Sequence, residues 1–168
     1  GLWIPNFVRI GISRSIAEDL KQHTDTSIKD VILSNPNRSS VFDQQILTLK
    51  NTINAQMKLM ERKQSSSEMK ENERKLCDML SKKMLLELTR KCAERYETYD
   101  PNMTNVRSID EALSKECNII FCTLSGSSMV PNMFPSIQFS TVIIDEAAQA
   151  VELSALIPVV SLPRLTKM

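Results

Sequence analysis

The feature that constrains this chain most is a stretch from Ser39 to Tyr99 that contains neither glycine nor proline. Because glycine and proline are the residues that most often interrupt helices, this stretch is free to be helical throughout. Its apolar residues recur every three or four positions, the spacing that gathers them on one face of a helix. They form two stripes, one of Ile46, Leu49, Ile53, Met57 and Met60, and one of Cys77, Leu80, Met84, Leu88, Cys92 and Tyr96.

A polar break from Gln64 to Glu68 separates the two stripes. The pattern predicts one helix over about residues 39–63 and another over about 67–98, with Ser66 or Ser67 as the cap of the second. Two amphipathic helices joined by a short turn are expected to fold back as an antiparallel hairpin. Residues 38–99 carry 13 Lys or Arg against 9 Asp or Glu. This excess indicates either a solvated coiled-coil face or an arm that approaches a phosphate backbone.

The sequences on either side of this stretch predict strands. Continuous apolar runs at 7–12, 118–124 and 141–144 have the composition of buried strands. Runs without polar alternation are typical of a parallel sheet that is covered on both faces. The predicted fold class is therefore α/β, a parallel sheet with an inserted long antiparallel helical hairpin. We divide the chain into residues 1–37, 38–100 and 101–168.

Shorter helices are expected between the predicted strands. One is expected at 13–21, and another at 108–114 with Ser108 and Glu111 in capping-box spacing. A third is expected over 147–157, where Pro158 would stop it. The type of the apolar patch at 28–33 stays open.

The composition excludes several kinds of site. Three glycines, at positions 1, 11 and 126, are too far apart to build a phosphate-binding loop or a dinucleotide fingerprint. The single histidine, His23, excludes a zinc site built on several histidines, and its polar neighbours predict a solvated surface position. The four cysteines form no C-x-x-C pair and are expected to be buried free thiols. No apolar run approaches the ~20 residues of a membrane span, so no membrane partner is expected.

The strongest chemical signal is T-V-I-I-D-E-A-A-Q, from Thr141 to Gln149. Here two carboxylates, Asp145 and Glu146, follow a predicted strand directly, at the edge of the sheet where α/β proteins bind ligands. Adjacent carboxylates favour a bound cation, and phosphoryl-transfer enzymes use such a pair to hold Mg²⁺ and to orient water. The alternative is that Asp145 only caps the following helix.

A second, weaker signal follows the preceding strand, where the sequence from Cys122 to Ser128 reads C-T-L-S-G-S-S. Hydroxyls and amides at the end of a strand can bind phosphate or ribose oxygens, although an ordinary loop has the same composition. Together the two segments resemble the senataxin-type helicases, which are Upf-like members of helicase superfamily 1. The resemblance rests on N-I-I-F-C-T-L-S-G-S, on F-S-T-V-I-I-D-E-A-A-Q-A-V-E-L-S-A-L-I-P-V, on V-R-I-G at Val8 and on I-K-D-V-I-L at Ile28.

The resemblance implies a partial RecA-like parallel sheet. It also implies that the helical hairpin corresponds to the insertion called the prong in the first RecA-like domain of this family. It also implies an ATP-dependent RNA/DNA helicase with ATP and Mg²⁺ as cofactors. In that family Asp145 would belong to the Walker B motif and help to hold Mg²⁺. Glu146 would activate the attacking water, and Gln149 would support the nucleotide site.

The same resemblance implies that Thr123, Ser125 and Gly126 touch single-stranded RNA or DNA, and Arg9 lies in an earlier motif of the family. The family's phosphate loop and its G-D-x-x-Q motif have no counterpart in this sequence. We therefore expect an internal piece of a nuclear helicase that is inactive without the remaining helicase domains, and that meets protein partners through the hairpin. The alternative is a non-catalytic coiled-coil interaction module on a small α/β platform.

Overall fold

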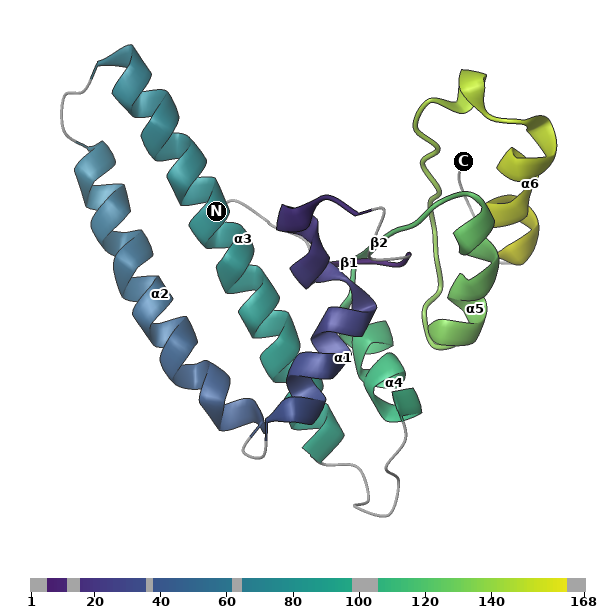
Figure 1. Ribbon diagram of the computed structural model, residues 1–168, viewed down its shortest axis with the longest axis horizontal. Coiled ribbons are helices and arrows are strands. Elements are labelled where there is room, and N and C mark those ends of the chain that lie inside the picture. Colours follow the sequence, from purple (N-terminus) through teal and green to yellow (C-terminus); the bar gives the residue numbers. More distant parts are fainter. Residues whose placement is uncertain (1–5, 12–15, 36–37, 62–64, 98–105, 163–168) are drawn as a thin grey trace.

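The computed structural model describes residues 6–11, 16–35, 38–61, 65–97 and 106–162. In this part of the chain the fold is mostly helical, with one small two-stranded parallel sheet (Figure 1). None of the described helices combines the length and the apolar character that a membrane span needs.

The two longest helices lie side by side and run in opposite directions (Figure 1). They are α2 (Arg38–Met60) and α3 (Ser66–Glu97), so the predicted pair of helices is confirmed. The cap of α3 lies one residue earlier than predicted. Ser65 donates from its backbone N–H and its Oγ to Glu68 Oε2, at 3.0 and 2.7 Å, and Glu68 N–H donates back to Ser65 Oγ at 3.4 Å. This reciprocal capping box satisfies amide groups that the first turn would otherwise leave without partners.

The stripes are buried mainly at the base of the hairpin, where α2 begins and α3 ends, although Ile53 farther along α2 is also only 5% exposed. Phe42 and Ile46 of α2 and Leu88 and Cys92 of α3 are all at most 6% exposed. Toward the tip the predicted stripes face solvent: Met57 is 51% exposed, and Cys77 is exposed rather than buried as we expected. The prediction of a buried Cys77 was wrong. The helix α2 still lies beside this part of α3, as the 3.0 Å hydrogen bond from Gln56 to Asn72 shows, but the half-buried side chains there are those of Leu76, Met79 and Leu80.

The sheet consists of β1 (Phe7–Arg9) and β2 (Ile119–Phe121), which pair in parallel with Phe7 opposite Ile119 and Arg9 opposite Phe121. Two of the three predicted strands are thus confirmed, in shorter form. The third, at 141–144, is wrong: only Thr141 makes an isolated bridge, and Ile143 is 89% exposed. A strand requires a neighbour for its backbone N–H and C=O groups, and no described strand lies beside residues 142–144.

Two helices join the base of the hairpin to the sheet. They are α1 (Asp25–Ser34), which settles the open assignment of 28–33, and α4 (Val106–Glu116). Lys29 of α1 pairs with Asp110 of α4 at 2.6 Å and with Asp25 at 3.3 Å. Ser108 does not cap α4 as predicted, because the helix already begins two residues before it.

The predicted helix at 13–21 is a short 3-10 helix, η2 (Glu18–His23), and residues 13–15 of that prediction lie outside the described residues. The prediction that His23 is a surface residue was wrong, since it is 3% exposed. Its ring stacks on Phe7 of β1 with centroids 4.4 Å apart, and its Nε2 lies 3.5 Å from Ser81 Oγ of α3. The polar neighbours of His23 gave no sign of this contact, because its burial comes from residues distant in the sequence.

The C-terminal part of the described chain is made of short elements. After β2 come η3 (Ser125–Met129) and α5 (Val130–Met133), and then a long extended segment leads to η4 (Ala147–Gln149) and α6 (Glu152–Ser161). The helix predicted over 147–157 therefore begins five residues later, because Ala150 and Val151 have extended backbone. It also continues through Pro158. The helix α6 packs against η3 (Figure 1).

Candidate functional site

The carboxyl ends of β1 and β2 bring Arg9 to the start of the Thr123–Ser128 turn. Arg9 is the last residue of β1 and lies opposite Phe121, and the next amide, that of Ile10, donates to Phe121 O at 2.8 Å. Arg9 Nε is buried, and within the described chain it has no hydrogen-bond partner. Burial raises the pKa of the Cys122 thiol, and the nearby Arg9 charge partly opposes that rise. A half-buried arginine with a buried Nε therefore lies beside the end of β2.

The turn itself is held by its own hydroxyl groups. Thr123 Oγ1 accepts from the Gly126 N–H at 3.1 Å and lies 3.3 Å from Ser125 Oγ. A Cβ on Gly126 would stand 2.9 Å from Thr123 Oγ1, so this close approach requires glycine. Thr123 and Ser125 are exposed, so their hydroxyls face solvent from a fixed backbone.

Ser127 and Glu116 are residues of this region that the sequence alone did not single out. Ser127 is 3% exposed, and its Oγ donates to Leu124 O at 2.5 Å, which holds the turn from the inside. The serine-rich run itself was the signal that could have indicated this role. Glu116, just before β2, pairs with two cations of α3, and nothing in the local sequence indicates partners that are 21 and 25 residues away.

The acidic pair lies in a second place, at the start of η4. Asp145 and Glu146 are both exposed, and Asp145 Oδ1 accepts from the Glu146 N–H at 2.9 Å. Glu146 has left-handed backbone, with φ 52° and ψ 34°, which is uncommon for a residue other than glycine. Its carbonyl accepts from the Gln149 N–H at 2.8 Å, so one tight turn holds Asp145, Glu146 and Gln149 together.

The donor set of this turn suits magnesium in its chemistry. Two carboxylates and an amide offer hard oxygen atoms, and Mg²⁺ is usually held by one or two carboxylates together with waters and substrate phosphates. The described residues contain no cluster of three or more metal-ligating side chains. The turn therefore fits a metal that shares its ligands with a nucleotide, and it does not form a cage for a metal alone.

The structure thus places the predicted residues in two groups. Arg9, Thr123, Ser125 and Gly126 lie at the carboxyl ends of the paired strands, and the Asp145–Gln149 turn lies beyond the extended segment. Within the described ranges no hydrogen bond or ion pair joins the two groups. Their connection is the packing of α6, which follows the acidic turn, against η3, which contains Ser125 and Gly126.

Comparison with known proteins decides the family. A family model described as AAA domain matches residues 3–166, nearly the whole chain. The chain belongs to the AAA domain family. Over 52 residues it is also 48% identical to a protein of Schizosaccharomyces pombe named "Helicase sen1". No solved structure matches the chain significantly.

The relative confirms the resemblance to senataxin-type helicases. The matched segment covers 31% of this chain and 3% of the relative, so the chain corresponds to a small part of that protein's length. The AAA domain family and a relative named as a helicase together make this chain a helicase-family segment.

Proposed function

We propose that this chain is part of the first RecA-like domain of an ATP-dependent RNA/DNA helicase of the senataxin type. The observation that carries the proposal is the T-V-I-I-D-E-A-A-Q run, in a chain that belongs to the AAA domain family and matches a relative named as a helicase. In this proposal residues 38–100 are a prong-like insertion, and residues 1–37 and 101–168 belong to the RecA-like domain. The two antiparallel helices and the parallel pairing of β1 with β2 support it.

The acidic turn would contribute the hydrolytic chemistry. Bound Mg²⁺ would neutralise charge on the β- and γ-phosphates of ATP. Asp145 would hold the metal through an oxygen that its bond to the Glu146 amide leaves free. Glu146 would accept a proton from the attacking water, a role that its solvent-facing carboxylate allows. Gln149 would position the nucleotide from the same turn.

The strand ends would contribute contacts to the nucleic acid. Thr123 and Ser125 offer exposed hydroxyl groups to a phosphate, and Gly126 would hold them in place because it lets Thr123 Oγ1 approach the backbone of the turn closely. Arg9 supplies a positive charge at the same edge. These groups would contact the sugar-phosphate backbone and not the bases. We therefore expect single-stranded RNA or DNA to bind without sequence preference, and with an affinity that falls strongly as salt rises. A nuclear location and cooperation with the remaining helicase domains belong to the same proposal.

Binding of single-stranded RNA tests the nucleic-acid half of the proposal. Fluorescence anisotropy with a labelled oligouridine, at several salt concentrations, should show weak binding that falls steeply as salt rises. Arg9→Ala should weaken it several-fold, whereas Lys75→Ala, a matched removal of one positive charge on the exposed distal half of α3, should change it less. Equal losses for the two variants would refute the assigned role of Arg9.

The hydrolytic half is tested in the longer helicase that contains this chain. Glu146→Gln should abolish most ATP turnover but keep nucleotide binding, because binding depends on the metal and the phosphate loop. Glu152→Gln, an exposed carboxylate on the adjacent helix α6, is the matched control and should retain turnover. Near-normal turnover in Glu146→Gln would contradict the proposed water activation.

A further inference from the structure

Glu116, the last residue of α4, is bound on both of its carboxylate oxygens by cations of the hairpin. Arg95 donates to Oε1 from Nε at 2.8 Å and from a terminal nitrogen at 2.6 Å, and Lys91 Nζ lies 3.2 Å from Oε2. The Glu116 side chain is only 12% exposed, so this contact is more shielded than an ordinary surface ion pair. Both cations lie in the last turns of α3.

The backbone of the same residue is tied to the sheet. Glu116 O accepts from the Asn6 side-chain amide at 3.0 Å, directly before β1. Asn6 in turn exchanges bonds with Asn118, which directly precedes β2: Asn6 N–H donates to Asn118 Oδ1 at 3.2 Å and Asn118 N–H donates to Asn6 O at 2.8 Å. Glu116 therefore joins the base of the hairpin to the starts of both strands.

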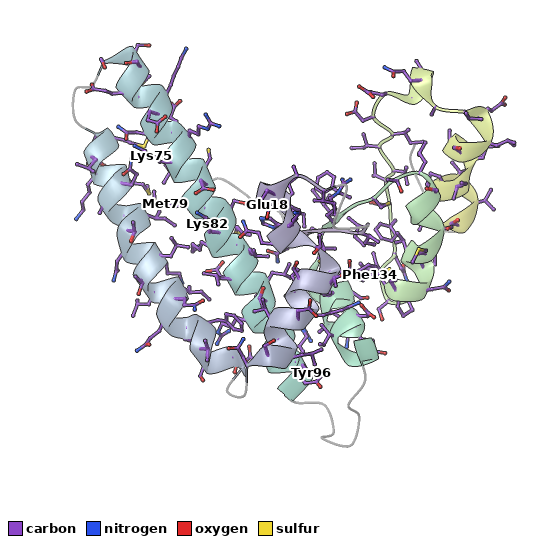
Figure 2. The ribbon with its side chains drawn as sticks, viewed as in Figure 1. Glu18, Lys75, Met79, Lys82, Tyr96 and Phe134 are labelled. Carbon is purple, nitrogen blue, oxygen red and sulfur yellow. The ribbon has the colours of Figure 1, made fainter. Side chains whose placement is uncertain are left out.

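The helix α3 is buried over only a short segment near its end, so a small change of angle there would move the far end of the hairpin by a larger distance. The buried residues of α3 all lie between positions 88 and 93, and Figure 2 shows Lys75 and Met79 on the part of α3 that projects away from the sheet. From Lys91 to the start of α3 the distance is about 38 Å at 1.5 Å per residue. A tilt of about 10° at the base would thus move the tip by about 7 Å.

We infer that Glu116 is a positioning residue that sets the direction of the hairpin relative to the strand edge carrying Arg9 and Thr123. The buried contacts of α3 hold the helix against α4, but apolar packing is not directional. Arg95 binds Oε1 through two nitrogens and Lys91 binds Oε2, so charge-assisted hydrogen bonds, which are directional, hold the carboxylate from both oxygens. The positioning role itself does not depend on the proposed function. Only the expected effect of the hairpin direction on nucleic-acid affinity rests on it.

The direction of the hairpin can be measured by the distance between two spin labels. One label is attached to the exposed Cys77 of α3, and the other to Asn132→Cys, an exposed position of α5 that lies between the buried Val130 and Phe134. The remaining thiols should react slowly at neutral pH, because burial raises the pKa of Cys92, Cys122 and Cys117, the last to about 12. Labelling stoichiometry checks this selectivity.

Glu116→Gln should broaden the distance distribution, and Glu116→Lys, which opposes two cations, should also shift its mean. Combining Glu116→Lys with Lys91→Glu and Arg95→Glu should restore the distribution. Glu94→Lys is the control, since among the described residues this exposed carboxylate of α3 forms an ion pair only with Arg90 of its own helix. Unchanged distributions in both Glu116 variants, or equal broadening in the control, would overturn the assignment.

Circular dichroism separates positioning from folding. A positioning role predicts unchanged helicity in Glu116→Gln, and a loss of helicity there would overturn it even if Glu116→Lys fails to fold. Oligouridine affinity should fall in step with the change in distance. The distance between the spin labels is measured without nucleic acid. A shifted distance with unchanged oligouridine affinity would therefore refute the proposed function but not the positioning role of Glu116.

Discussion

Removing the side chain of Leu88 tests whether the base of the hairpin is its structural centre. Leu88 is 1% exposed and belongs to the main buried cluster, together with residues of α2 and α4. Truncating a buried leucine to alanine costs about 2 to 5 kcal/mol, because the lost burial is joined by the cost of the cavity. A destabilisation of about 3 kcal/mol corresponds to a loss of roughly 6 to 12 °C in Tm for a chain of this size.

Leu47→Ala is the matched control, because Leu47 lies on α2 and is 59% exposed. An exposed truncation of this kind changes the free energy of unfolding by less than about 0.5 kcal/mol. Thermal and urea unfolding, followed by circular dichroism, measure both variants. Equal shifts in Tm for Leu88→Ala and Leu47→Ala would refute the reasoning that burial is concentrated at the base.

Gly126→Ala should destabilise the chain by about 1 to 3 kcal/mol in urea unfolding, because the new Cβ meets Thr123 Oγ1 at 2.9 Å; stability equal to wild type would contradict this contact. Burial alone would raise the pKa of Glu116, but hydrogen bonds from Arg95 and Lys91 outweigh it and lower the pKa from its ordinary 4.5. The stabilisation by Glu116 is therefore present above pH 4.5 and lost as the pH falls through the lowered pKa, so Glu116→Gln should flatten stability against pH in that acidic range. The chain alone should release no phosphate from Mg²⁺-ATP with single-stranded RNA, because the sequence lacks a phosphate loop; turnover above a Glu146→Gln control would contradict this.

The long helices could be predicted because their signals are local. The absence of glycine and proline and the recurrence of apolar residues were sufficient to place both α2 and α3 within a few residues. The depth of burial could not be predicted in the same way. Leu49 and Leu80 occupy central positions of the stripes and are only partly buried, whereas Ile53, which lies closer to the tip than Leu49, is 5% exposed.

The end of α3 is buried more widely than its stripe predicted. Thr89 and Ala93 are at most 4% exposed although neither belongs to the stripe, because α3 contacts α4 and α1 as well as α2. Thr89 satisfies its hydroxyl locally, by donating to Leu85 O at 2.8 Å. An apolar stripe in the sequence indicates that a helix packs against one other element. Contacts with further elements depend on segments that are distant in the sequence.

The motifs in the sequence proposed each residue of the candidate site, but they did not indicate that these residues lie in two groups. The order of the motifs along the chain does not say which strand ends are neighbours. The parallel pairing of β1 with β2 brings Arg9 to the Thr123 turn across more than one hundred residues. The sequence did not indicate the left-handed backbone of Glu146 either, because glycine is the residue that usually adopts that conformation.

The segment before Asp145 shows that a strand-like composition is not sufficient to form a strand. The run T-V-I-I has the composition of a buried parallel strand, yet Ile143 is 89% exposed, and the sheet in the described part of the chain consists of β1 and β2 alone. Composition determines how much apolar surface a segment can bury, whereas a strand also needs a second backbone to accept its hydrogen bonds. In the proposed RecA-like sheet, residues 142–144 would have to pair with an open edge of β1 or β2 or with a strand outside the described part of the chain. Forming that pair would cover Ile143 and fix the backbone directly before Asp145 and Glu146.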